Sequence, residues 1–252
     1  RDKVVLMTKF GLRWNMKKGS KYFTTKDNEG NELELYKYSG PESVIKECEL
    51  SLKRLKTDYI DLFQIHWPDD TTPIAETMNA CRKLVQEGKV RAVGVSNYSA
   101  SQITEAETVL LPASNQIPYS MINRGIETET VPYCMDKNIG ILAYSPLQRG
   151  FLTGKIKADH TFKPGDHRVS SSYFKKVNYT QILALLKKCE PMAMDKGVTL
   201  AQLVIQWTIQ QPGITSALVG ARNRKQVMEN SKASDIVLSQ SEIKQINTWL
   251  DE

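Results

Sequence analysis

Apolar residues along this chain gather in short runs that alternate with amphipathic stretches, at a period of roughly 30 residues. The short runs predict six strands, at residues 4–8, 59–65, 91–95, 115–117, 141–144 and 217–219. They are apolar almost throughout, as expected for a parallel sheet that is covered on both faces. The alternation therefore predicts an α/β fold in which helices pack on a parallel sheet.

Helices are predicted between these runs, because apolar residues recur there three or four positions apart. Ser99 and Ser239 are suitable N-caps, and Gly88 is a suitable stop signal. The predicted helices cover about 41–55, 74–87, 99–110, the stretch before Gly140, 179–196, 200–211 and 239–250. A closed (β/α)₈ barrel has eight strands, so the six predicted strands account for only part of one.

Two connections are too long to be simple turns. Residues 11–40 are polar and contain the sequence KDNEGNELELYKY, which predicts a small hairpin turning at residues 28–31. Residues 147–178 are rich in glycine, lysine and serine. Connections of this length are usually functional or mobile.

Polar side chains follow the predicted strands at the points where the strands end. They are Lys9, His66, Ser96, Asn97, Gln116, Tyr144, Ser145 and the segment 220–222. Each has a structural interpretation by itself; His66, for example, could be a satisfied core histidine. Their recurrence at six successive strand ends favours a shared site, because α/β barrels carry their active sites on the rim formed by these ends.

The 252 residues suit one α/β barrel or two smaller domains. No apolar run approaches the ~20 residues that a membrane helix needs, so no membrane association is expected. The four cysteines, Cys48, Cys81, Cys134 and Cys189, are widely spaced and form no CxxC pair. We interpret them as buried free thiols in a reducing cytoplasm and expect no metal site.

The net charge of +6 allows two interpretations. Lysines and acidic residues alternate along most of the chain, which favours a solvated surface of mixed sign. Arg149, Lys155, Arg222, Arg224 and Lys225 fall near predicted loops, which favours an anionic ligand. Nucleic acid is not indicated, because no basic stripe with interleaved aromatic residues is present.

Six segments resemble the aldo-keto reductase family and occur in that family's order. They are VVLMTKFG (4–11), DYIDLFQIHWPDD (58–70), GKVRAVGVSNYS (88–99), NQIPYSMINR (115–124), AYSPLQRGFLTGK (143–155) and VGARNRKQVMEN (219–230). The resemblance implies a (β/α)₈ TIM barrel, with residues 1–252 in a single domain. It also implies an oxidoreductase that reduces small aldehydes or ketones to alcohols with NADPH, without a metal, as a monomer or homo-oligomer.

The resemblance assigns a role to each matched residue of the reaction centre. Lys9 matches the lysine that lowers the pKa of the family's catalytic tyrosine, and His66 matches the histidine that hydrogen-bonds the substrate carbonyl. The residues that match the nicotinamide-binding groups are Ser96, Asn97 and Gln116, with Tyr144 as the stacking ring. Trp14 and Trp67 are expected to form walls of the substrate pocket.

The remaining matched residues belong to the other parts of the cofactor site. Those that match the diphosphate-binding turn are Ser145, Leu147, Arg149 and Gly150. Those that match the segment around the 2′-phosphate and adenine are Gly220, Ala221, Arg222, Gln226, Glu229 and Asn230. Arg222 can make charge-assisted hydrogen bonds to a 2′-phosphate, which predicts NADPH as the cofactor.

The family's catalytic aspartate and tyrosine lie between its second strand and second helix, a segment that this sequence does not match. The resemblance therefore implies barrel strands 3–8, with two β/α units of ~30 residues each missing and no general acid. Two explanations remain open. Either the natural protein has a further N-terminal part, or the polypeptide is this short and reductase activity is lost.

Two other functions remain to be weighed against reduction. A nucleotide-binding regulatory module resembling potassium-channel β subunits would share the cofactor site but show little turnover. An aldolase-type barrel could use Lys9 to form a Schiff base, but the SN, NQ and GAR segments would then have no explanation. The sequence favours the reductase.

Overall fold

The computed structural model describes residues 1–157, 159–163, 165–170 and 176–252. The chain divides into two compact units. Unit 1 comprises Arg1–Ile117 and Glu129–Ile141, and unit 2 comprises Pro118–Thr128 and Leu142–Glu252. Among the described residues, no helix is long and apolar enough to cross a bilayer.

Unit 1 is built on a parallel sheet whose strand order follows the chain. Its strands are β1 (Met7–Phe10), β5 (Ile60–Ile65), β6 (Val90–Ser96) and β7 (Ser114–Pro118), each parallel to its neighbour. β8 (Gly140–Tyr144) begins beside β7, because the Gly140 N–H donates to the Ala113 carbonyl at 3.0 Å. This arrangement confirms the predicted α/β fold class.

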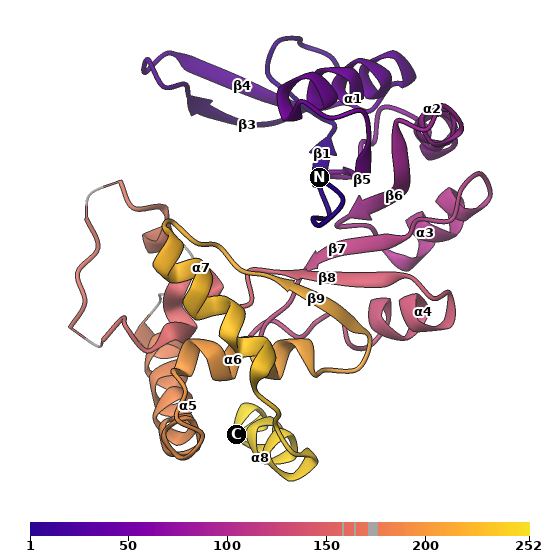
Figure 1. Ribbon diagram of the computed structural model, residues 1–252. Coiled ribbons are helices and arrows are strands. Elements are labelled where there is room, and N and C mark those ends of the chain that lie inside the picture. The colour runs from indigo at the N-terminus through magenta and orange to yellow at the C-terminus, as the bar shows by residue number, and fades with distance from the viewer. Residues whose placement is uncertain (158, 164, 171–175) are drawn as a thin grey trace. The chain divides into compact units, whose positions relative to one another are not determined.

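Helices pack against this sheet and against one another in chain order (Figure 1). They are α1 (Pro41–Leu55), α2 (Ile74–Gln86), α3 (Ala100–Glu107) and α4 (Thr130–Asp136). α1 packs on β1 and α2, and α2 packs on β6 and α3. The predicted cap of α3 is confirmed, since Ser99 and Gln102 form a reciprocal capping box.

The connection after β1 contains the predicted hairpin, which is a three-stranded antiparallel sheet of its own. Its strands are β2 (Leu12–Arg13), β3 (Ser20–Lys26) and β4 (Glu32–Lys37), in the order β2-β4-β3. Asp27 fixes the turn between β3 and β4, because its carboxylate accepts the backbone N–H of Glu29 and Asn31 at 2.9 Å. In Figure 1 the hairpin extends away from β1 and β5.

Unit 2 contains the end of β8 and the last strand, β9 (Ile214–Leu218). Its helices are η1 (Gln148–Thr153), η2 (His167–Ser170), α5 (Lys176–Asp195), α6 (Leu200–Ile209), α7 (Arg224–Ser231), η4 (Lys232–Asp235) and α8 (Gln240–Asp251). Trp207 on α6 is fully buried. It stacks on Tyr119 at 5.9 Å and donates to Asn247 of α8 at 2.9 Å.

The described residues contain all six predicted strands, with some shifted bounds. The first strand begins at Met7, because Val4 and Val5 are apolar but exposed and pair with no strand. α7 was not predicted, and none of its residues is buried, so it has no apolar face for a sequence pattern to detect. Residues 158, 164 and 171–175 of the second long connection lie outside the described part.

Candidate functional site

Four of the predicted site residues form one hydrogen-bonded group at the strand ends of unit 1. The Ser96 Oγ and the Asn97 N–H both donate to the Gln116 carbonyl, at 2.7 and 2.9 Å. The Asn97 Nδ2 donates to the His66 carbonyl and to the Ser96 Oγ, each at 3.1 Å. The ends of β5, β6 and β7 are thereby held together, which places His66, Ser96, Asn97 and Gln116 in one site.

Asn97 takes this position through an unusual backbone conformation. Its φ of 62° is left-handed, a region that asparagine tolerates better than most residues. The chain turns sharply there as it leaves β6, so the side chain points back across the strand end to the His66 carbonyl. Asparagine at this position therefore both makes the turn and joins two strands.

Lys9 and His66 have electrostatic environments that suit a reaction centre. Burial, with a further contribution from the Lys9 charge, lowers the pKa of His66 to about 4. His66 is therefore neutral at pH 7, and a neutral imidazole can donate an N–H to a carbonyl oxygen. Burial also lowers the pKa of Lys9.

Aromatic residues and a lysine lie next to His66. The Trp67 ring lies 5.4 Å from the Tyr22 ring of β3, and the Lys37 Nζ lies 5.7 and 5.2 Å from these two rings. Trp67 thus contacts Tyr22 and Lys37, neither of which was predicted, and its place in the wall of a substrate pocket stays a prediction. Trp14 is 59% exposed, and its role in the pocket stays a prediction.

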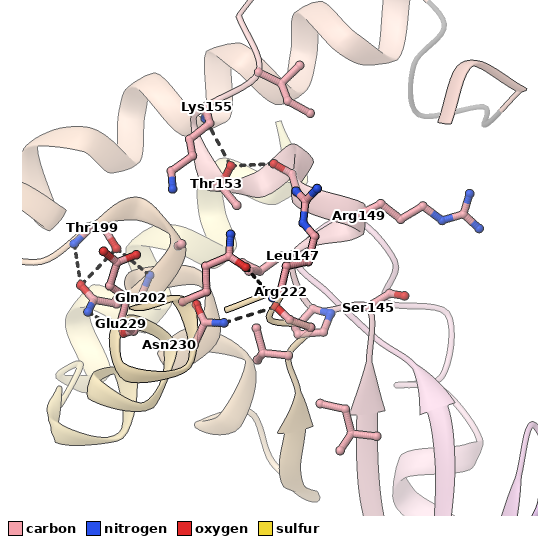
Figure 2. A pocket seen from close by; sticks show the side chains of 18 of the residues that line it. Ser145, Leu147, Arg149, Thr153, Lys155, Thr199, Gln202, Arg222, Glu229 and Asn230 are labelled. Carbon is pink, nitrogen blue, oxygen red and sulfur yellow. Dashed lines mark hydrogen bonds between the residues drawn. The ribbon is translucent and has the colours of Figure 1, made fainter. Parts of the chain in front are cut away.

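Unit 2 contains a cavity of about 550 Å³, shown in Figure 2. It lies between the segment that follows β8 and the segment that follows β9, and α6 closes one side. The predicted residues that line it are Ser145, Leu147, Arg149, Gly150, Gly220, Arg222, Gln226, Glu229 and Asn230. Tyr144 and Ala221 were predicted with them but are not among the lining residues.

The turn after β8 gives one wall of the cavity a run of left-handed backbone. Ser145, Gln148, Arg149 and Gly150 have φ values of 58°, 44°, 55° and 93°. η1 is interrupted at Arg149 and Gly150 for this reason. Turns that combine right- and left-handed residues direct backbone N–H groups into a concave anion-binding surface.

The opposite wall is fixed by hydrogen bonds at the start of α7. The Asn223 side chain caps the helix by accepting the Gln226 N–H at 3.0 Å. The Gln226 Oε1 accepts the Arg222 N–H at 2.6 Å, and the Asn230 Nδ2 donates to the Gly220 carbonyl at 3.4 Å (Figure 2). These contacts hold the backbone of 220–222 while the Arg222 side chain remains exposed.

Positive charge predominates around this cavity. The lining cations are Arg149, Lys155, Arg168 and Arg222, and Glu229 is the lining acid. Arg168 is paired with Asp166 at 2.6 Å, whereas the described ion pairs include none for Arg149, Lys155 or Arg222. An exposed cation without a carboxylate partner costs little to bring against a phosphate, so the cavity is suited to a phosphorylated ligand.

Comparison with known proteins identifies the family of the chain. Residues 1–251 match the Aldo/keto reductase family. The chain belongs to this family. The match shows an oxidoreductase that acts on small-molecule carbonyl compounds with a nicotinamide cofactor, and it confirms the resemblance drawn from the sequence.

This aldo/keto reductase is similar to proteins whose names give different substrates and cofactors. The chain is 36% identical to NADH-specific methylglyoxal reductase of Escherichia coli (strain K12), over 96% of this chain and 73% of that protein. It is 34% identical to aldo-keto reductase yakc [NADP(+)] of Schizosaccharomyces pombe, over 100% of this chain and 71% of that protein. The structure of the glycerol dehydrogenase AKR11B4 from Gluconobacter oxydans is similar with a TM-score of 0.89 at 36% identity, covering 98% of this chain and 72% of that one.

Some residues that line the unit 2 cavity of this aldo/keto reductase were not predicted from the sequence. Thr153, Arg168, Thr199 and Gln202 line the cavity of unit 2 but follow no strand. Thr199 and Gln202 form the capping box of α6, a signal that predicts a helix start and no ligand. Lys155, which the sequence indicated only as a basic residue near a predicted loop, also lines the cavity.

Proposed function

We propose that the unit 2 cavity binds the diphosphate and the 2′-phosphate of NADPH. The observation that carries this proposal is the combination of left-handed backbone at 145–150 with unpaired cations around one cavity. Backbone N–H groups suit a diphosphate, and the Arg222 guanidinium suits a phosphate monoester. The phosphate-binding part of a nicotinamide cofactor therefore fits these residues.

The preference for NADPH over NADH rests on Arg222. The names of the two relatives include an NADH-specific and an NADP(+) enzyme, so family membership leaves the choice open. Arg222 extends from a backbone held by Gln226 and does not pair with a carboxylate among the described residues. A charge-assisted hydrogen bond to the 2′-phosphate contributes roughly 1.5–3 kcal/mol, and NADH lacks that group.

The test is a fluorescence titration of the chain and two variants with NADPH and with NADH. Arg222→Leu is expected to weaken NADPH binding by about 10- to 100-fold and to leave NADH binding within about twofold. Arg224→Leu is the matched control, because Arg224 is exposed at the start of α7 but does not line the cavity. Equal affinity of the unchanged chain for the two cofactors would contradict the assignment.

In the same proposal, the rim of unit 1 binds the nicotinamide carboxamide and the substrate carbonyl. The cofactor supplies the hydride. His66 donates an imidazole N–H to the carbonyl oxygen, on which negative charge develops. Ser96, Asn97 and Gln116 orient the carboxamide, and Lys9 provides positive charge beside His66.

We further propose that this chain alone turns over slowly. None of its ten tyrosines matches the family's catalytic tyrosine by motif. Loss of a general acid typically slows a reaction ~10²–10⁴-fold. NADPH absorbance with a generic aldehyde measures turnover for this chain and for a form that carries the family's tyrosine segment, and comparable rates would refute the hypothesis. Slow cofactor release without reduction in both forms would favour the regulatory-module alternative.

A further inference from the structure

Gln64 is a buried polar side chain that the roles assigned above do not use. It lies near the end of β5 and is 2% exposed, and the other buried residues of this strand are apolar. A buried amide is unfavourable unless it is hydrogen-bonded, so its partners indicate what it does. Those partners lie on β7, which is two strands away.

The register of the sheet shows how Gln64 reaches β7. Gln64 pairs with Gly94 of β6, and Gly94 pairs with Ser114 of β7, so the three residues form one row across the sheet. Gln116 lies two residues beyond Ser114 and therefore faces the same side in the next row. Gln64 Nε2 donates to Gln116 Oε1 at 3.3 Å, and Ser114 Oγ donates to Gln64 Oε1 at 3.4 Å.

Gly94 provides the space for this crossing. A Cβ atom at Gly94 would lie 2.6 Å from the Ser114 Oγ and 2.9 Å from the Gln64 Cγ. The backbone of Gly94 is not left-handed, so a side chain is excluded here by the lack of space alone. The glycine in the sequence VGVSN therefore leaves open the path by which Gln64 passes over β6.

We propose that Gln64 is a positioning residue that sets the direction of the Gln116 amide. With its Oε1 accepting from Gln64, Gln116 presents its Nε2 as a hydrogen-bond donor to the carboxamide oxygen of a nicotinamide. This rests on the proposed binding of the nicotinamide at the rim of unit 1. Gln64 itself does not touch the cofactor, and its effect passes through Gln116.

Binding of two ligands can distinguish a positioning role of Gln64 from a general structural role. NADPH carries the nicotinamide, and 2′-phospho-ADP-ribose has the same phosphates and adenosine without it. Gln64→Met keeps the length of the side chain and removes both hydrogen bonds. By isothermal titration calorimetry, it is expected to weaken NADPH binding about three- to tenfold and to leave 2′-phospho-ADP-ribose binding within about twofold.

Gly94→Ala is a second, independent variant, because its methyl group displaces the Gln64 side chain without altering either glutamine. It is expected to show the same selective loss. Thr77→Val is the matched control, since it removes a buried hydrogen bond of the same unit, from the Thr77 Oγ1 to the Ser39 carbonyl at 3.0 Å, away from this row. It should leave the affinities for both ligands unchanged.

The outcomes distinguish this inference from the proposed function. If the unchanged chain binds neither ligand, the proposed cofactor site is wrong. If it binds both, and Gln64→Met weakens both equally or neither, the cofactor site stands and the positioning role of Gln64 is overturned. A side-chain amide resonance of Gln116 that moves in Gln64→Met, but not in Thr77→Val, is expected in the chain without ligand.

Discussion

His66 illustrates how a single side chain acquires its chemistry from its position. Its imidazole is half-buried at the end of β5, and the Lys9 charge lies close enough to oppose its protonation. Both effects keep it neutral at physiological pH, so its N–H can donate to a carbonyl oxygen over a wide pH range. A fully solvated histidine would be partly protonated near pH 6.5.

A titration of the histidine resonances by NMR is expected to place the pKa of His66 at about 4, well below that of free histidine. In Lys9→Met the pKa of His66 should rise, because one of the two causes of its depression is removed. His66→Gln identifies the resonance. A His66 pKa near 6.5 in the unchanged chain would contradict the burial that the structure assigns to it.

The lowered pKa of His66 also makes the stability of the folded chain depend on pH. Between pH 6.5 and about 4 the unfolded chain binds a proton at His66 that the folded chain does not bind. The contribution of His66 to the free energy of unfolding is therefore fully present above pH 6.5 and is lost as the pH falls through this window. Urea unfolding of His66→Gln should accordingly show a smaller decline from pH 7 to pH 4.5 than the unchanged chain shows.

At the scale of single residues, the sequence predicted which polar residues the strand ends bring together. His66, Ser96, Asn97 and Gln116 stand where apolar runs stop, and parallel strands bring such ends together. Gln64 was not predicted, because its contact with Gln116 depends on the register of three strands and on the missing side chain of Gly94. Register is not visible in a single apolar run.

The element that follows β1 is tied to α1 by a buried ion pair. Arg13 is 4% exposed and lies 3.1 Å from the carboxylate of Glu47, which also accepts the Gly11 N–H at 3.2 Å. Burial raises the pKa of Glu47, and the Arg13 charge opposes that rise. The pair therefore holds the chain where it leaves the strand that carries Lys9.

Arg13→Met is expected to lower the free energy of unfolding by roughly 3–5 kcal/mol at pH 8, because Glu47 remains as a buried charge without its partner. The difference in free energy of unfolding between Arg13→Met and the unchanged chain should become smaller toward pH 5. There the folded variant binds a proton at Glu47 more readily than the unfolded variant does, and this binding stabilises the folded state. Urea unfolding measures both. Arg82→Met is the control, because Arg82 is exposed on α2, where it donates a hydrogen bond to the Asn79 side chain. If Arg13→Met lost as little free energy of unfolding as Arg82→Met, the stabilising role of the Arg13–Glu47 pair would be contradicted.

At the scale of elements, helices with an apolar face were predicted even where no side chain caps them, as for α1 and α2. The capping boxes at Ser99 and Ser239 are both present. α7 was missed because it buries no side chain, although its Asn223 cap is a recognisable signal. The hairpin was predicted, but the contact of Tyr22 with Trp67 depends on an irregular register between Lys21 and Phe23 that no sequence pattern specifies.

Over the whole chain, the order of segments predicted the family correctly because each segment carries a strand end together with the polar residues that follow it. That residues 1–252 form one domain stays a prediction, because the chain divides into two compact units. The four tryptophans provide a test, since Trp14 and Trp67 belong to unit 1 and Trp207 and Trp249 belong to unit 2.

For a single domain we expect all four tryptophans to report one unfolding transition. Labelling the chain with 5-fluorotryptophan and following the four fluorine resonances through a urea titration gives four midpoints in one sample. These should coincide within error. Two separate midpoints, one for each pair of tryptophans, would show that the units unfold independently and that the single-domain prediction is wrong.

The burial of all four cysteines has a practical consequence for labelling experiments. Burial raises the pKa of Cys48 and Cys134 to about 11 and that of Cys189 to about 12, and it also raises that of Cys81. Because alkylating reagents attack the thiolate, the native thiols should react very slowly with maleimides. A cysteine introduced in place of exposed Arg149 would then be the fast-reacting thiol of the folded chain, and its protection from maleimide would report directly when a nucleotide enters the unit 2 cavity.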